Sequence, residues 1–319
     1  MTLDLFFAVV MLAALIAYAL LGCADFGGGI WDLLAVGPRA ADQRRLIARA
    51  IGPVWEANHV WLIFLVVLLF TCFPAAYTRA SIALFWPLHL VLIGIVLRGA
   101  AYVFRAYASE TALARGVWGG VFGAASAITP VLLGMCLGAV SAGRVQAWDA
   151  PFAVATGVLA LLICAYLAAV YLAWESHDAA LREDFRRRAV AVWWLAGAAS
   201  AITLLLAKSE APRLWAGLTA WPALVFLIGG SVLAPLSFVA LTRGRFEAAR
   251  WLGAAQIVAL LAGWAAAQWP YLIYPELTVD GAAAPASTLA LTAWTLPFGL
   301  AALLPALWFL FSVFKRRPR

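Results

Sequence analysis

The 319-residue chain has few charged residues, few histidines and few cysteines. Charged side chains make up 12% of the residues and hydrophobic ones 66%, whereas soluble domains carry about 25% charged residues. This shortage excludes an ordinary soluble domain and predicts an all-α polytopic membrane protein. The cysteines form no CxxC pair, so we interpret them as small apolar side chains in or beside spans. They are Cys23, Cys72, Cys136 and Cys164.

Long polar segments are also missing. Nine apolar runs are each long enough to cross about 30 Å of hydrocarbon at 1.5 Å per residue. The longest segments between them have roughly 15–20 residues, too few for a soluble domain. We therefore predict one transmembrane domain over residues 1–319, with about nine helices in antiparallel bundles. The runs lie near residues 5–24, 53–73, 80–104, 117–141, 151–174, 188–207, 218–241, 249–270 and 289–314.

Acidic residues are the scarcer charge, 15 against 22 Lys and Arg, which gives a net charge of +7. With nine spans, the basic residues gather on one side of the membrane. The positive-inside rule then predicts an N-out, C-in topology, and the asymmetry explains the net charge without a nucleic-acid partner. The outer side holds Arg79, Arg144, Lys208 and Arg213. The 18 inner residues are Arg39, Arg44, Arg45, Arg49, Arg98, Arg105, Arg115, Arg182, Arg186, Arg187, Arg188, Arg243, Arg245, Arg250, Lys315, Arg316, Arg317 and Arg319.

Two carboxylates fall at or near membrane depth, where ionisable groups are costly and are functional candidates by default. Asp25 stands at the predicted inner end of the first span. In residues 52–62 (GPVWEANHVWL), Pro53 suits the first turn of the second span. This start places Glu56 one turn inside the bilayer and His59 on the same helix face, about one turn deeper.

Two interpretations fit these residues. In the first, Asp25 caps a helix or pairs with a basic residue such as Arg98, and Glu56 rests at the interface. In the second, the two carboxylates form a hydrated proton-entry site, because desolvation raises the pKa of a carboxylate and lets it exchange protons near neutral pH. Asn58 and His59 would then extend a hydrogen-bonded relay inward.

Isolated histidines argue against ligation by this chain. His59 and His89 each stand alone in a span and His177 lies in a loop, so we expect no metal site and no haem bound here, although a single axial ligand facing a cavity can hold a haem. The glycines at 27–29 lack the strand and the Lys-Ser/Thr pair of a phosphate-binding loop. We expect close helix approach or a sharp turn there. Most of the 16 tryptophans fall near span ends, as in an interfacial aromatic belt.

The chain resembles subunit II of the cytochrome bd-type quinol oxidases, including the cyanide-insensitive branch. The resemblance follows the whole chain in order through residues 51–62 (IGPVWEANHVWL), of which residues 55–62 (WEANHVWL) are its most specific part. One departure concerns the family's DGFD element, which is Gly22-Cys23-Ala24-Asp25 here, so the role of its first acid does not carry over. The other matching elements are residues 24–29 (ADFGGG), 44–45 (RR), 73–77 (FPAAY), 97–99 (LRG), 269–271 (WPY) and 275–278 (PELT).

The resemblance implies a subunit of a quinol:oxygen oxidoreductase in the bacterial cytoplasmic (inner) membrane, with no catalytic residue in this chain. Its partner, subunit I, would carry two b-type haems and a haem d or a further haem b, oxidise quinol and reduce oxygen to water. Glu56, with Asp25 at the entrance, would belong to a proton path from the cytoplasm. A structural quinone in this chain and a small third subunit are further implications.

Two other functions use the same residues. A secondary transporter or an ion channel also needs acidic groups at depth, but transporters place them near the midplane on interrupted helices, and here they cluster near one face. A scaffold subunit without a proton role is the second alternative. Haem in a complex purified through this chain would separate the oxidase from both.

Overall fold

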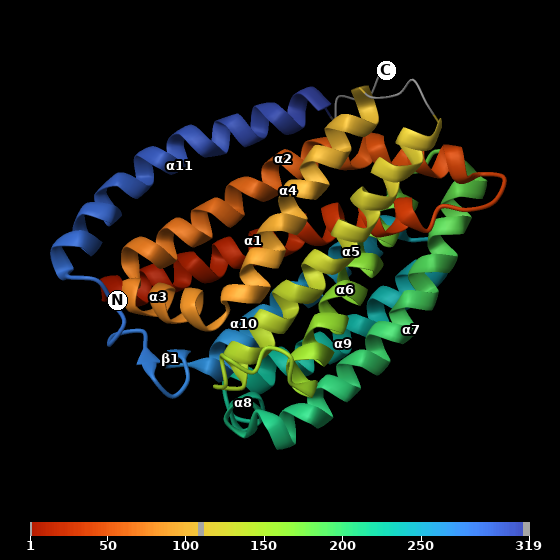
Figure 1. Ribbon diagram of the computed structural model, residues 1–319. Helices are drawn as coiled ribbons and strands as arrows, with labels where there is room; N and C mark the ends of the chain where they lie inside the picture. Colours follow the sequence, from red (N-terminus) through yellow and green to blue (C-terminus); the bar gives the residue numbers. More distant parts are fainter. Residues whose placement is uncertain (1, 108–111, 315–319) are drawn as a thin grey trace.

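The computed structural model describes residues 2–107 and 112–314, apart from the side chains of residues 51, 53, 56, 106, 107, 112–115, 311 and 314. Within these residues the fold is helical except for loops and one β-hairpin (Figure 1). The helices are α1 (Leu3–Leu33), α2 (Ala40–Cys72), α3 (Pro74–Ala83), α4 (Phe85–Tyr107), α5 (Ala112–Ser141), α6 (Pro151–Glu175), α7 (Ala179–Glu210), α8 (Pro212–Leu218), α9 (Ala223–Thr242), α10 (Phe246–Gln268) and α11 (Ala286–Phe314). The antiparallel strands β1 (Tyr271–Ile273) and β2 (Leu277–Thr278) lie between α10 and α11.

The number of spans agrees with the sequence. Among the described residues, eight helices are long and apolar enough to cross a membrane: α1, α4, α5, α6, α7, α9, α10 and α11. Residues 57–72 of α2 meet α3 at a bend of 116°, and this bent pair brings the number to nine where it counts as one span. The predicted all-α polytopic fold with about nine membrane helices is therefore confirmed.

The predicted boundaries around the first loop are wrong. α1 continues to Leu33 instead of ending near residue 24, so Asp25 lies inside the helix. α2 begins at Ala40, which places Pro53 well within it and not in its first turn. The early part of α2 is helical because Gln43, Ile47 and Ala50 recur at helical spacing and are buried. Hydropathy detects only the bilayer-crossing part of such a helix.

Small residues let the central helices approach closely. A Cβ atom added to Gly27 would lie 2.1 Å from the carbonyl oxygen of Cys164 on α6. One added to Gly29 would lie 2.1 Å from the Oγ of Ser126 on α5. Both glycines are buried inside α1. The run at 27–29 therefore serves close helix approach, as small residues do in membrane bundles, and the chain makes no turn there.

Two ion pairs between loops and helix ends place predicted outer arginines at one end of the molecule. Arg79 pairs with Glu276 of the hairpin, and Arg144 pairs with Glu210. Both arginines were predicted to share the outer side, and they lie at the end of the molecule that holds α3, α8 and the hairpin (Figure 1). The last residues of α11 lie at the opposite end. This grouping fits the predicted loops, while the N-out, C-in orientation stays a prediction.

α11 stands apart from the bundle. It runs along the edge of the molecule beside α2, and α7 lies on the opposite edge (Figure 1). In its most apolar window no residue is buried, and it contains Pro297 and Pro305. A membrane helix with so little cover from its own chain faces lipid or another subunit.

Candidate functional site

A buried ion pair joins α1 to α4. Arg98 donates from Nη2 to Asp25 Oδ1 over 2.5 Å and from Nη1 to Asp25 Oδ2 over 2.8 Å. The Asp25 side chain is 0% exposed and that of Arg98 is 2% exposed. The expected charge partner of Asp25 is thus present, and the first interpretation of Asp25 describes its contacts.

Other helices complete the surroundings of this pair. The Nε of Arg98 donates to Ser126 Oγ of α5 over 2.8 Å. Its guanidinium lies over the rings of Phe26 and Phe122, 5.2 and 4.9 Å from their centroids. A planar cation with fixed donors suits such a site better than a lysine would. The arrangement fixes the positions of α1, α4 and α5 around one charge.

Asn58 brings α2 to the same site. Its Nδ2 donates to Asp25 Oδ2 over a long 3.4 Å, and it is buried against Gly22. Among the described residues, Asn58 Oδ1 has no hydrogen-bond partner, and neither does the buried hydroxyl of Tyr18, seven residues before Asp25 on α1. Buried polar atoms of this kind are commonly satisfied by ordered water. The site is therefore suited to hold water beside the ion pair.

A second ion pair repeats the first one two turns along the same helices. Asp32 and Arg105 follow Asp25 and Arg98 by seven residues each, and Arg105 donates from Nη1 to Asp32 Oδ2 over 2.6 Å. Arg105 also lies over the Phe122 ring, at 5.8 Å. Its side chain is 26% exposed. Sequence reasoning missed this pair, although the equal seven-residue spacing of two acids and two arginines was a readable signal.

The remaining predicted site residues lie on α2. The side chain of Glu56 is outside the described residues, and its backbone belongs to α2. His59 donates from Nδ1 to the carbonyl of Trp55 over 2.7 Å, which leaves Nε2 as its accepting atom. Trp55 stacks on Tyr102 of α4, with 5.8 Å between centroids. The structure thus brings Asp25, Asn58 and Arg98 together, and it describes no contact between His59 and that group.

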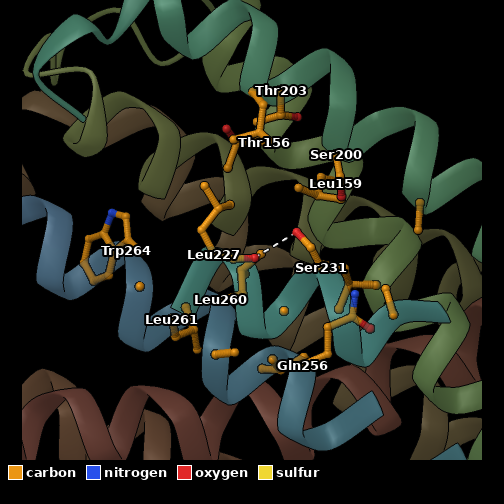
Figure 2. Close-up of a pocket in the computed structure, with 18 of the residues that line it drawn as sticks. Thr156, Leu159, Ser200, Thr203, Leu227, Ser231, Gln256, Leu260, Leu261 and Trp264 are labelled. Carbon is orange, nitrogen blue, oxygen red and sulfur yellow. Dashed lines mark hydrogen bonds between the residues drawn. The ribbon is translucent and has the colours of Figure 1, made fainter. Parts of the chain in front are cut away.

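An apolar cavity of about 330 Å³ opens between α5, α6, α7, α9 and α10. Figure 2 shows its few polar side chains, with Thr156, Ser200 and Thr203 on one side and Gln256 on the other. Its described walls hold no histidine, cysteine or methionine. His89, the other histidine in a span, donates to the carbonyl of Phe85. The lining of this cavity therefore does not fit a haem.

Comparisons with known proteins decide the family. A family model described as cytochrome bd terminal oxidase subunit II matches residues 3–314. The chain belongs to the cytochrome bd terminal oxidase subunit II family. The putative cytochrome bd menaquinol oxidase subunit II of Bacillus subtilis is 27% identical over 327 aligned residues, covering 95% of this chain and 92% of that protein. Subunit 2 of the Escherichia coli K12 cytochrome bd-I ubiquinol oxidase is 30% identical over 125 residues, 39% of this chain and 32% of that protein.

The fold agrees with this assignment. The structure of the bd oxidase from Geobacillus thermodenitrificans contains a chain that superposes with a TM-score of 0.83 at 22% identity, with 100% of both chains covered. This cytochrome bd subunit II is a multi-pass protein of the bacterial inner membrane and part of a quinol oxidase complex. The assignment favours the oxidase over the transporter and channel alternatives.

Proposed function

We propose that this subunit II supplies the proton route from the cytoplasm to a haem-bearing subunit I, in an N-out, C-in orientation. The observation that carries the proposal is the Asp25–Arg98 pair with Asn58 against it. A charge pair without exposed surface inside apolar helices is costly, and such residues mark proton and ion paths in membrane proteins. Oxygen reduction consumes protons that hydrocarbon does not conduct, so the complex needs a polar route.

Each residue has a separate task in this route. Glu56 collects the proton, because a carboxylate can both accept and release one. Asp25 is held in place by two bonds from Arg98 and accepts from Asn58. Water on Asn58 Oδ1 continues the chain of hydrogen bonds. The free Nε2 of His59 is the accepting atom further along α2.

Turnover of the intact complex tests the route. Glu56→Gln keeps the shape of the side chain and removes its titration, so quinol oxidase turnover should fall at least about tenfold while haem content stays normal. Glu247→Gln is the matched control, because Glu247 is an exposed acid in the first turn of α10. Normal turnover in a fully haem-loaded Glu56→Gln complex would refute the route. So would an equal loss in the control.

Subunit I, with its two b-type haems and a haem d or further haem b, is proposed to cover the face made by α2, α4 and α11. α11 touches mainly α1 and α2 and is otherwise uncovered. Helices whose outer faces are apolar face lipid or a partner, and α11 is the helix with the least cover from its own chain in its apolar window among the described spans. A small third subunit would bind outside this face. The exposed apolar residues there are Ile63, Val67, Phe70, Ile93, Val96, Trp294, Phe298 and Trp308.

The cavity is proposed as the place of a structural quinone. It is lined mostly by apolar side chains, with a few hydroxyls and the amide of Gln256 (Figure 2). Small-molecule sites combine an apolar wall with a few placed polar groups in this way. The Gln256 amide is the group suited to donate to a quinone carbonyl, and the wall accommodates the isoprenoid chain.

A further inference from the structure

A polar pocket lies where the loop between α1 and α2 meets the start of α7. It has a volume of about 230 Å³, and its lining includes Arg39, Arg187 and Arg188, with Asp184 as its acid. Two of these four charges cancel, because Arg39 binds Asp184 through Nε and Nη2 over 2.8 and 2.5 Å. The remaining arginines give the pocket a positive excess.

Arg188 is the residue that sets this excess. It has no carboxylate partner among the described residues, and its Nη2 donates to Gln43 over 2.9 Å. Its guanidinium lies 5.1 Å from the ring centroids of both Trp31 and Phe185. Its Nη1 is buried and without a hydrogen-bond partner in the described part of the chain. A fixed cation held on aromatic rings is ready to receive an anion.

Arg187 adds an accessible charge on the other side of the opening. Its side chain is 75% exposed, and among the described residues its one hydrogen bond runs from Nε to Glu183 over 2.9 Å. Both of its Nη atoms are therefore available to a phosphate oxygen, for which the arginine fork has the matching geometry.

The pocket has an apolar rim on the same loop. Val36, which lines the pocket, is 74% exposed, and Leu33 and Leu34 at the end of α1 are exposed as well. In the proposed N-out, C-in orientation, on which this inference rests, the rim belongs to the cytoplasmic end of α1, at the level of the lipid headgroups. Basic pockets at this level on the cytoplasmic side bind anionic headgroups. Exposed apolar side chains beside the charges fit acyl chains.

We propose that this pocket binds the phosphate of an anionic phospholipid, with Arg187 and Arg188 on the phosphate and Val36 against the acyl chains. Free inorganic phosphate shares the charge but has no acyl chain. The rim therefore distinguishes the two sources. The ligand would hold the loop of residues 34–39 against α7 in the inner leaflet.

Native mass spectrometry of the purified complex, reconstituted with phosphatidylglycerol or phosphatidylcholine, tests the proposal. Arg187→Gln with Arg188→Gln should lower retained phosphatidylglycerol, by roughly fivefold for each arginine, and leave phosphatidylcholine unchanged. Val36→Asp should lower it too. Arg243→Gln, an exposed arginine outside the pocket, is the control and should retain the wild-type amount.

Several results would overturn the assignment. One is wild-type retention in the double variant or an equal loss in the Arg243→Gln control. Another is binding of inorganic phosphate that displaces phosphatidylglycerol and is unaffected by Val36→Asp, which would assign the pocket to a free anion. If the double variant does not assemble, Arg187→Gln alone tests the proposal, because that exposed side chain contributes little to folding. Its loss should still lower the retained phosphatidylglycerol about fivefold.

Discussion

Replacing Arg98 by leucine should destabilise this subunit far more than replacing Arg105. Both arginines lie on α4, seven residues apart, and each binds an aspartate of α1 through two hydrogen bonds. Their surroundings differ, since the Arg98 side chain is 2% exposed and that of Arg105 is 26% exposed. The two variants thus compare the same chemistry at two degrees of burial.

The magnitude follows from the charge left behind. Removing one member of a buried pair costs about 3–5 kcal/mol, because the other charge stays buried and unpaired. Arg98→Leu leaves Asp25 in that state and also removes the bond to Ser126. Arg105→Leu also leaves a buried carboxylate, since the Asp32 side chain is 3% exposed, but loss of the partly exposed Arg105 side chain admits water to it, so the cost should be smaller than that of Arg98→Leu. The double change Asp25→Leu with Arg98→Leu removes both charges and should recover most of the loss.

Denaturant titration of the complex in mixed micelles measures these differences, with the fluorescence of the 16 tryptophans as the signal. The expected order of the free energy of unfolding is wild type, Arg105→Leu, the double variant, and Arg98→Leu as the least stable. An Arg98→Leu variant as stable as Arg105→Leu would refute the reasoning, because burial would then have no effect on the cost of the lost partner.

Three further results are expected. The hydrogen bonds from Arg79 lower the pKa of Glu276. The hairpin contact should therefore persist above the unfolded-state pKa of about 4.3 and weaken as the pH falls through the lower folded-state pKa. Hydrogen exchange of residues 271–278, corrected for intrinsic rates, should become faster at that pH in the wild type and should not depend on pH in this way in Arg79→Gln. In intact cells, an impermeant thiol reagent should label Arg79→Cys and not Arg182→Cys. Labelling of residue 182 from the outside would contradict the predicted N-out, C-in topology. Gly230→Leu, which fills the cavity, should remove co-purifying quinone, whereas Gly229→Leu, outside the lining, should retain it. Equal amounts of quinone in the two variants would exclude the cavity as the quinone site.

The sequence predicted the membrane class and the number of spans, because both depend on the length of apolar runs and little else. It did not predict where α1 and α2 end. Hydropathy reports the part of a helix that lies in hydrocarbon, while the ends of these helices depend on packing outside it. Gln43 shows this, since it is buried by contacts with Asp184 and Arg188 that lie more than 140 positions away. For the glycines at 27–29 the sequence left two alternatives, and packing decides for close helix approach, because Gly27 lies against α6 and Gly29 against α5.

The ion pairs explain why the candidate site was found only in part. Asp25 was recognisable as a costly acid, but its two bonds to Arg98 depend on how α1 and α4 pack, and these helices are not joined by one loop. That geometry also changes the role proposed for Asp25. Two bonds from a buried arginine fix the position of the Asp25 carboxylate. Beside it, the Oδ1 of Asn58 and the hydroxyl of Tyr18 have no hydrogen-bond partner among the described residues. We therefore propose that Glu56 on the next helix takes up the proton and that the Asp25–Arg98 pair orders the polar groups around Asn58.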